Sequence, residues 1–308
     1  MKDFKGRTAV LTGGASGFGL ECARIAAREG MNVVLVDVQA DALAAAQAEI
    51  AALAAPHLEA GGGRVLAQRV DVSSAAAMEA LAATVQREFG APHFVFNNAG
   101  IATGGLVWEH SVKDWEWTLG VNLWGVVHGV RLFTPMMLAA AAADPAYEGH
   151  IVNTASMAGL LSPPNMGIYN VSKHAVVTLS ETLYQDLGLV SDQVHAHVLC
   201  PYFVPTGIHK SERNRPQDMA NEGGPSKSQL IAQAMSDKAV GSGKVSAADV
   251  AAKVFAALRE NQFYIYSHPR ALGGVQTRLE DVLQGRNPTD PFHERPELRV
   301  QLMAQLRG

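Results

Sequence analysis

Short apolar runs alternate with helix-like segments along most of the chain, and this alternation restricts the fold more than any other feature. Runs typical of buried strands are Thr8 to Thr12, Asn32 to Val38, Arg64 to Val70 and His93 to Asn97. Helical patterns follow the first three, at Gly19 to Glu29, Asp41 to Ala54 and Ala75 to Phe89. The strands show no alternation between apolar and polar positions, which indicates burial on both faces in a parallel sheet. Repeated βαβ units of this kind predict a doubly wound α/β fold.

The second half of the chain continues the pattern. A helix is expected from Val112 to Ala142, kinked near Pro135, and a second from Ile168 to Gly188. Further strands are expected at His150 to Ala155, Gln193 to Cys200 and Phe263 to Tyr266, with a helix capped by Ser246 before the last of them. Residues 203–245 interrupt the pattern with prolines and glycines. A loop-rich stretch of this length predicts a lid.

The composition excludes several classes of protein. With 48% hydrophobic and 18% charged residues, the chain can bury a large core. A formal net charge of −4 gives no reason to expect nucleic acid or an anionic membrane as a partner. No apolar run approaches the roughly 18 residues that span a bilayer, and the N-terminal segment lacks the apolar stretch of a signal peptide. Cys22 and Cys200 are expected to be free thiols, and the chain to be cytoplasmic.

A glycine-rich turn joins the first strand to the first helix. It reads Thr12-Gly13-Gly14-Ala15-Ser16-Gly17-Phe18-Gly19, with glycines spaced Gly-x3-Gly-x-Gly. Glycines let a backbone approach a diphosphate closely, and the helix start offers unpaired N–H groups. The turn, with Ser16 and Phe18, is therefore a candidate phosphate-binding site. The alternative is a turn that only closes a βα unit.

Acidic residues end the second and third strands. Asp37 lies 18 residues after Gly19, where a carboxylate can accept hydrogen bonds from both hydroxyls of an adenosine ribose. Its charge would repel a 2′-phosphate, and no basic residue follows it directly, so the sequence favours NAD over NADP. Asp71, in Asp71-Val72, could reach the adenine amino group. Either carboxylate could instead be a helix cap.

A serine, a tyrosine and a lysine form a candidate catalytic set. Tyr169 lies 13 residues after Ser156, and Lys173 follows one helical turn later. An ammonium about 4 Å from a phenol could lower the phenol pKa toward neutrality and make it a general acid/base. Ser156 could hold the substrate oxygen. The alternative for Tyr169 and Lys173 is an ordinary pair on a surface helix.

Together these motifs resemble the short-chain dehydrogenase/reductase family over about residues 5 to 267. The shared elements are Thr12-Gly13-x3-Gly17-x-Gly19, Asp71-Val72, Asn97-Asn98-Ala99-Gly100, Asn122, Ser156 and Tyr169-x3-Lys173. The resemblance implies a Rossmann-type parallel sheet of seven strands flanked by helices, in the order 3-2-1-4-5-6-7. Residues 1–267 would be a single dinucleotide-binding catalytic domain. The activity implied is NAD-dependent hydride transfer between nicotinamide and a secondary alcohol or ketone.

The resemblance also implies individual roles. Tyr169 would be the acid/base, Lys173 would bind the nicotinamide ribose, and Ser156 would polarise the substrate carbonyl. Asn122 would hold a water that links Lys173 to solvent. The cofactor site would be walled by Asn98, Ala99 and Gly100 and would include Pro201, Val204 and Thr206. Tyr202 departs from the family, which has glycine there, and could enter the substrate pocket or shift this loop.

The substrate is expected to be a small apolar or aromatic molecule. The segments that would face it carry Met157, Met166, Tyr202 and Phe203 beside Ser156. In length, N-terminal start and extended C-terminus the chain is similar to bacterial dehydrogenases that oxidise the benzylic alcohol of lignin-derived aryl ethers. No metal-site spacing is present, and His195 and His197 are interpreted as structural.

The family resemblance also implies a homodimer or homotetramer, paired through helices 112–140 and 168–188. Residues 268–308 exceed the family core and are expected to form an extension at a subunit interface. Two other functions stay open. One is a non-catalytic nicotinamide-binding regulator. The other is a hydrolase that uses Ser156, although Thr154 and Ala158 occupy the glycine positions of its Gly-x-Ser-x-Gly motif.

Overall fold

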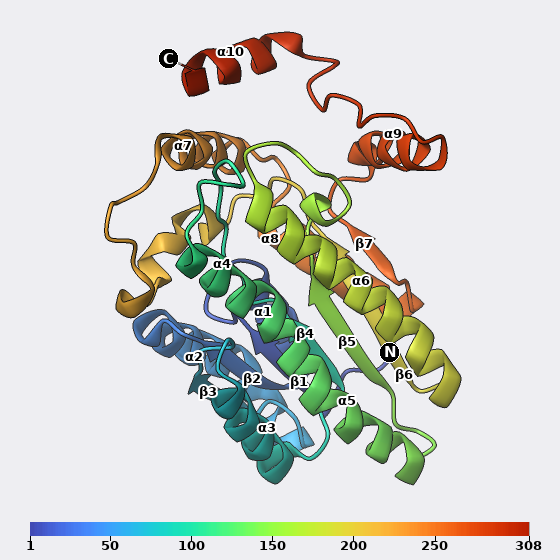
Figure 1. Ribbon diagram of the computed structural model, residues 1–308. Coiled ribbons are helices and arrows are strands. Elements are labelled where there is room, and N and C mark those ends of the chain that lie inside the picture. The colour runs from blue at the N-terminus through green and yellow to red at the C-terminus, as the bar shows by residue number, and fades with distance from the viewer. Residues whose placement is uncertain (308) are drawn as a thin grey trace.

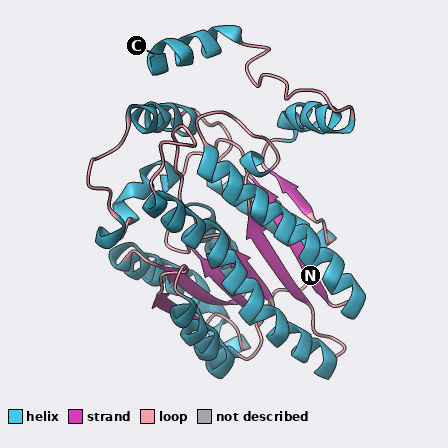
Figure 2. Cartoon of the chain, viewed as in Figure 1, coloured by secondary structure: helices cyan, strands magenta, loops and turns pink. Residues whose placement is uncertain are grey.

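Every strand of the sheet runs parallel to its neighbours, as the unbroken apolar runs predict (Figures 1 and 2). The computed structural model describes residues 1–307. The strands are β1 (Thr8–Thr12), β2 (Asn32–Asp37), β3 (Val65–Arg69), β4 (Phe94–Asn97), β5 (Gly149–Thr154), β6 (Val194–Cys200) and β7 (Tyr264–Tyr266). Their order is β3-β2-β1-β4-β5-β6-β7, which confirms the predicted topology.

Helices cover both faces of the sheet. One layer holds α1 (Gly17–Arg28), α2 (Ala40–Ala54) and α8 (Ala247–Glu260), and the other holds α3 (Ala75–Phe89), α5 (Gly125–Ala143) and α6 (Gly167–Val190). Successive strand residues serve opposite layers, since Leu11 packs toward the first and Val10 toward the second. Both are fully buried. This two-sided burial explains why the strands carry no polar alternation.

The long helix predicted over 112–142 is interrupted near its start rather than at Pro135. It consists of α4 (Val112–Leu119), a π-helical turn (Gly120–Trp124) and α5, and α5 continues through Pro135 to Ala143. Phe133 and Met137 flank the proline and are fully buried, so packing holds the helix there. The sequence gives no warning of the π turn, because one extra residue in a helical turn leaves no compositional mark.

Within the described residues, one helical segment is long and apolar enough to cross a membrane by length and composition alone. This is Val112–Ala143, with a mean hydropathy of 1.4 over its most apolar window. The segment is not an uninterrupted apolar run of about 18 residues, because charged residues such as Lys113, Asp114 and Arg131 interrupt it. In the fold, α5 packs against α3, β4 and β5. A core helix of a parallel sheet meets the same criterion.

The segment predicted as a loop-rich lid contains a helix, α7 (Lys227–Gly241). Ser226 accepts a hydrogen bond from the Gln229 backbone, and the Gln229 side chain accepts one from the Ser226 backbone. This capping box fixes the start of α7. The cap predicted at Ser246 is present at the start of α8, where Ser246 and Asp249 form a second capping box.

Two helices follow the last strand, at the carboxyl edge of the sheet (Figure 1). They are α9 (Leu272–Leu283) and α10 (Pro296–Arg307), and α10 contacts α7 of the lid. The extension expected at residues 268–308 therefore contains two helices. The last residue of the predicted extension, Gly308, lies outside the described residues.

Candidate active site

The carboxyl ends of six strands surround one cleft, as in other open parallel sheets. Of the residues predicted to bind a cofactor, those that line it are Gly13, Ser16, Gly17, Phe18, Asp37, Asp71, Val72, Asn98, Ala99, Gly100, Tyr169, Lys173, Pro201 and Thr206. Gly19 and Val204 lie behind this lining. Gly19 is buried below the turn, and Val204 packs in the core beneath α1 and α8.

The glycine-rich turn is shaped as phosphate binding requires. Gly13 and Gly17 have φ angles of 63° and 52°, a region that favours glycine. A Cβ on Gly19 would lie 2.1 Å from the Gly13 carbonyl oxygen, so no other residue fits there. The N-cap of α1, Ser16, makes no side-chain capping hydrogen bond. The helix start therefore presents backbone donors to the cleft, and these fit a diphosphate.

Asp37 ends β2 and holds the glycine-rich turn in place. Its Oδ2 accepts a hydrogen bond from the Ala15 amide at 3.1 Å, and its Oδ1 accepts one from the Gln39 amide at 3.0 Å. Each carboxylate oxygen has a second lone pair, and the residue lines the cleft. Asp37 can thus support the turn and accept hydrogen bonds from a ribose. The cap of α2 is Gln39, without a side-chain bond, so Asp37 is not its N-cap residue.

Asp71 holds the turn before α3, although the N-cap of that helix is Ser74. Asp71 Oδ1 accepts hydrogen bonds from the Ser73 amide and hydroxyl at 2.9 and 2.7 Å, which stabilises the turn before α3. The residue also lines the cleft beside Val72.

Thr12 organises the segment after β4. Its hydroxyl accepts hydrogen bonds from the Asn98 and Ala99 amides at 2.9 and 3.1 Å, and the Asn98 amide group donates to the Thr12 carbonyl at 3.0 Å. Asn98 Oδ1 in turn accepts from the Thr154 hydroxyl at 3.3 Å. These contacts join the ends of β1, β4 and β5 into one rigid wall.

Asn122 lies in the π turn and is fully buried. Its Oδ1 accepts from the Ile101 amide at 2.8 Å, and its Nδ2 donates to the Ile101 carbonyl and the Ser172 hydroxyl. A Cβ on Gly100 would lie 3.3 Å from Asn122 Oδ1 and 3.6 Å from Lys173 Nζ. The side chains of Asn122 and Lys173 therefore converge behind Gly100, although the amide of Asn122 is already engaged by the protein.

Tyr169 and Lys173 line the inner end of the cleft, and Ser156 lies beside them, directly after the lining residue Ala155. Lys173 Nζ lies 5.7 Å from the centre of the Tyr169 ring and donates to the Thr154 carbonyl at 2.9 Å. The Ser156 hydroxyl accepts from the Ala158 amide, donates to the Pro201 carbonyl at 3.3 Å and interacts with the Tyr169 phenol. The three side chains are almost completely buried. A surface helix pair, the alternative reading of Tyr169 and Lys173, is excluded.

Burial controls the protonation of this set. It raises the pKa of Tyr169, while the interaction with Ser156 lowers it by less. Burial also lowers the pKa of Lys173 from 10.5 to about 8. The ammonium lies farther from the phenol ring than the ~4 Å assumed from the sequence and does not overcome this burial. Tyr169 is therefore held as a neutral phenol, which suits a proton donor.

Apart from Ser156 in the catalytic set, the residues predicted to contact substrate lie outside the lining of the described cleft; they are Met157, Met166, Tyr202 and Phe203. Met157 is 1% exposed and packs with Val176 and Val177 in the core. Met166 precedes α6 and forms a β-bridge with Gly105. The ring of Tyr202 lies against Phe203 and His268, at the start of the C-terminal extension, and is 43% exposed. Apolar patterning could not distinguish residues that pack in the fold from residues that line the cleft.

The lid supplies cleft residues that the sequence analysis missed. They are Ile208, Ser211, Arg213, Asn214 and Pro216, and they join Gln39, Trp117 and Val121 in the lining. A buried ion pair of 2.7 Å between Arg215 and Asp114 anchors this segment to α4. Arg215 also lies over the Trp117 ring, 5.0 Å from its centre. These residues come from segments far apart in the sequence, and only tertiary packing brings them together. No motif spacing could therefore predict that they line one cleft.

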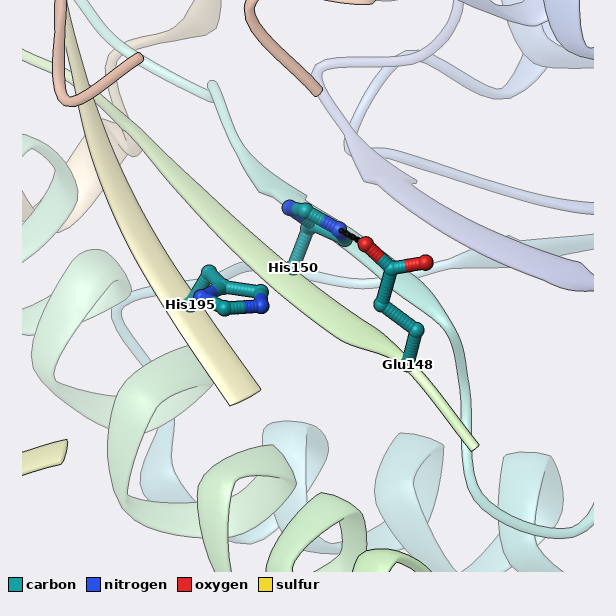
Figure 3. Close-up of side chains that lie close together, drawn as sticks. All are labelled: Glu148, His150 and His195. Atoms are coloured by element: carbon teal, nitrogen blue, oxygen red, sulfur yellow. Dashed lines mark hydrogen bonds and ion pairs between the residues drawn. The ribbon is translucent and has the colours of Figure 1, made fainter. Parts of the chain in front are cut away.

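Three potential metal ligands gather at the opposite, amino edge of the sheet (Figure 3). The ligand atoms of Glu148, His150 and His195 lie within 4.8 Å of one another, which no linear spacing had indicated. The Met1 ammonium already lies 2.6 Å from the Glu148 carboxylate and 3.1 Å from His150 Nε2. His197 bonds to His150 at 2.8 Å and to the Gln262 carbonyl at 2.7 Å. In this cluster the Met1 ammonium and the Glu148 carboxylate therefore form an ion pair, and His150 and His197 are held by structural hydrogen bonds.

Comparison with known proteins identifies the family. A family model described as short chain dehydrogenase matches residues 7–217. The CLA biosynthesis dehydrogenase/reductase of Lactiplantibacillus plantarum is 32% identical over 291 residues, covering 94% of this chain and 97% of that protein. The C alpha-dehydrogenase of Sphingobium sp. is 29% identical over 304 residues, with coverages of 98% and 94%.

A solved structure extends this similarity over nearly the whole fold. The short chain dehydrogenase/reductase from Burkholderia phymatum, in complex with NAD, has a TM-score of 0.87 and 49% identity, covering 94% of this chain and 99% of that one. These relatives are named dehydrogenases or reductases, which gives no support to a non-catalytic regulator. Given the matched family model, these relatives and the assembled Ser156, Tyr169 and Lys173, the chain belongs to the short-chain dehydrogenase/reductase family and is an oxidoreductase of that family.

Proposed function

We propose that the protein is an NAD-preferring dehydrogenase that interconverts a secondary alcohol and a ketone. The observation that carries this proposal is the convergence of Ser156, Tyr169 and Lys173 at the inner end of the cleft. The outer end of the same cleft holds the glycine-rich turn and Asp37. A dinucleotide that places its diphosphate on the turn and its ribose on Asp37 extends toward Tyr169.

Each side chain of the catalytic set has a distinct task. A bound nicotinamide supplies or accepts the hydride, and a side chain of the protein donates or accepts the accompanying proton. In the reduction direction, the Tyr169 phenol donates its proton to the substrate oxygen, while the Ser156 hydroxyl holds that oxygen by a hydrogen bond. Lys173 places a positive charge beside the resulting phenolate. In the oxidation direction, Tyr169 takes the proton back.

Apolar side chains around the catalytic set support an apolar or aromatic substrate. Ile101, Trp117, Val121 and Ile208 line the cleft, in which Lys173 and Arg213 are the basic lining residues. The similarity to the Sphingobium C alpha-dehydrogenase makes aryl secondary alcohols the first compounds to test.

The proposal is tested with a panel of aryl, alkyl and polyol secondary alcohols, each with NAD and with NADP. Reduction of the nicotinamide is followed by its absorbance, and cofactor binding is measured separately by calorimetry. We expect turnover with NAD and with aryl alcohols above polyols. Binding of NAD without turnover of any alcohol or ketone would contradict the proposal.

Asp37→Ala is expected to reduce the preference for NAD over NADP about 10- to 100-fold, through loss of charge-assisted ribose hydrogen bonds and of repulsion toward a 2′-phosphate. The measurement is kcat/KM with both cofactors. Asp41→Ala removes an exposed carboxylate close by and is the matched control. Asp37→Asn keeps a hydrogen-bond acceptor for the turn and separates charge from folding. If the ratio of kcat/KM for NAD to that for NADP is unchanged in both Asp37 variants, this carboxylate does not bind the ribose.

We further propose a homo-oligomer in the cytoplasm. Both cysteines are free and buried, which suits a reducing compartment. Exposed apolar side chains on the helices predicted to pair include Trp124, Val171 and Leu189. In the extension, Val282 and Leu283 of α9 are 67% and 84% exposed. Such side chains favour burial against a second copy.

Leu283→Glu is expected to shift the protein toward a smaller assembly, because a carboxylate is costly to bury at an apolar contact. Light scattering after size exclusion measures the mass against the 32.7 kDa of one chain. Glu280→Gln, a polar change on the same helix, is the control. A wild-type mass equal to one chain would refute the oligomer, and an unchanged mass in Leu283→Glu would remove α9 from the interface.

A further inference from the structure

An arginine of the lid reaches the cofactor cleft at the end remote from Tyr169. Arg213 lines the cleft together with Gly17, Asp37 and Gln39. Its Nε donates to Gln39 Oε1 at 3.3 Å, although the two residues are separated by 174 positions in the chain. In Figure 1 the gold segment that precedes α7 extends to the region of α2, which Gln39 caps. In the sequence, no basic residue directly follows Asp37, so an arginine beside Gln39 was not expected.

The guanidinium is held in one orientation by the lid backbone. Its Nη1 donates to the Gly207 and Lys210 carbonyls at 2.9 and 2.6 Å. Together with the contact to Gln39, these bonds engage Nε and Nη1. Arginine carries five N–H donors, so two remain on Nη2. Among the described residues, Nη2 has no hydrogen-bond partner.

The free nitrogen of Arg213 lies close to the phosphate-binding turn. A Cβ on Gly207 would be 3.3 Å from Nη2. The preceding residue, Thr206, has its side chain over Gly17, since a Cβ there would lie 3.5 Å from the Thr206 methyl. The consecutive residues Thr206 and Gly207 thus contact Gly17 and Nη2 respectively. The two unpaired N–H groups and the positive charge thus belong to a residue that lines the same cleft as the uncapped start of α1.

No carboxylate of the described chain neutralises this charge, because Arg213 forms no ion pair of 4.0 Å or less there. Its neighbour Arg215 differs, since it pairs with the buried Asp114. The two arginines of this segment therefore have different roles. Arg215 anchors the lid to α4, and Arg213 offers its charge to the cleft. A preoriented guanidinium with free N–H groups suits a phosphate oxygen.

We propose that Arg213 donates to the diphosphate of the bound dinucleotide and so ties the lid to the cofactor. This inference rests on the proposed function, since it assumes that a nicotinamide dinucleotide occupies the cleft. It adds a positioning residue, contributed by the lid rather than by the sheet edge. The contact makes lid closure depend on the cofactor, because the cofactor provides the anion that Arg213 lacks.

The test measures binding rather than turnover. Dissociation constants for NADH, NADPH, ADP-ribose and adenosine are determined by calorimetry for the wild type, Arg213→Ala, Arg213→Lys and Lys210→Ala. Lys210 is exposed on the same segment and serves as a matched loss of charge. Limited proteolysis within residues 203–245, with and without ADP-ribose, reports lid closure independently. Thermal unfolding of each variant without ligand checks that the fold is kept.

We expect Arg213→Ala to weaken binding of NADH and ADP-ribose about 10- to 100-fold, as for loss of one charge-assisted hydrogen-bonding group. Adenosine, which lacks the diphosphate, should bind all variants equally. Arg213→Lys should recover part of the affinity, and Lys210→Ala should change it less than about twofold. ADP-ribose should protect the lid from proteolysis in the wild type and not in Arg213→Ala.

Three outcomes would overturn the inference. One is unchanged NADH and ADP-ribose binding in Arg213→Ala. The second is an equal loss in Lys210→Ala, which would indicate only a general attraction between the lid and an anion. The third is a loss confined to NADPH, which would assign the contact to the ribose 2′-phosphate. Failure of the wild type to bind any dinucleotide would instead contradict the proposed function itself.

Discussion

Tyr169→Phe is expected to lower kcat at least about 10³-fold while the affinity for NADH stays within about twofold of the wild type. The substitution removes one oxygen from a side chain that is 8% exposed. The ring that packs against its surroundings remains. General acid/base groups contribute roughly 10² to 10⁴ in rate, and no other phenol or histidine lines the described cleft to replace this one.

The measurement pairs steady-state kinetics with calorimetric titration of NADH. Tyr184→Phe on the same helix is the control, because that side chain is 45% exposed and outside the cleft. It should retain full activity. Residual turnover above about one tenth of wild type in Tyr169→Phe would refute the assignment of the acid/base. Loss of NADH binding in that variant would show a structural role instead.

Lys173→Met is expected to abolish turnover and to make the folded protein more stable at neutral pH by about 2–3 kcal/mol. Burial lowers the pKa of Lys173 from 10.5 to about 8, so the folded state holds this proton less tightly than the unfolded chain. A buried cation therefore costs free energy in the wild type. Methionine fills a similar volume without charge, at the cost of leaving the Thr154 carbonyl without its ammonium donor.

The pH dependence follows from the sign of this shift. Below about pH 8 Lys173 is charged in both states, and its burial cost is fully present. As the pH rises from about 8 toward 10.5, the folded state loses its proton first, and the cost disappears. The stability advantage of Lys173→Met should therefore be complete at pH 7 and much smaller near pH 10.

Denaturant unfolding of both proteins at several pH values measures this difference. Lys253→Met, a change at an exposed lysine of α8, is the control and should alter stability by less than about 0.5 kcal/mol at any pH. A Lys173→Met protein less stable than the wild type at neutral pH would contradict the burial cost. It would indicate that the ammonium stabilises the fold through its contacts.

Local sequence patterns were sufficient to predict the sheet and the residues at its strand ends, but not the contacts made by the lid. Gly13 directly follows β1 and Asp37 ends β2, so their convergence follows from strand order, while Lys173 joins Tyr169 through the spacing of one helical turn in α6. Arg213 reaches Gln39 across 174 residues, through irregular backbone that obeys no period. Its position depends on the Arg215–Asp114 pair and on tertiary packing, neither of which leaves a pattern in sequence.

Two other features of the structure differ from what the sequence predicted. The helix α7 could have been predicted from Ser226 and Gln229, a capping signature that nearby glycines and prolines obscured. The grouping of Glu148, His150 and His195 could not, because strand register rather than spacing places His150 opposite His195. In a parallel sheet the two strands are joined by a long crossover, so ligand spacing rules do not apply.

The π turn at Gly120–Trp124 makes the length of this segment a fixed quantity. Deleting one residue would restore regular α-helical hydrogen bonding but rotate all of α5 by about 100° about its own axis relative to α4. Phe133 and Met137 would then swing off the sheet, and Asn122 would leave the back of Gly100. A substitution here leaves the helical register unchanged. A deletion of one residue would instead displace the packed face of α5 and the side chain of Asn122 together.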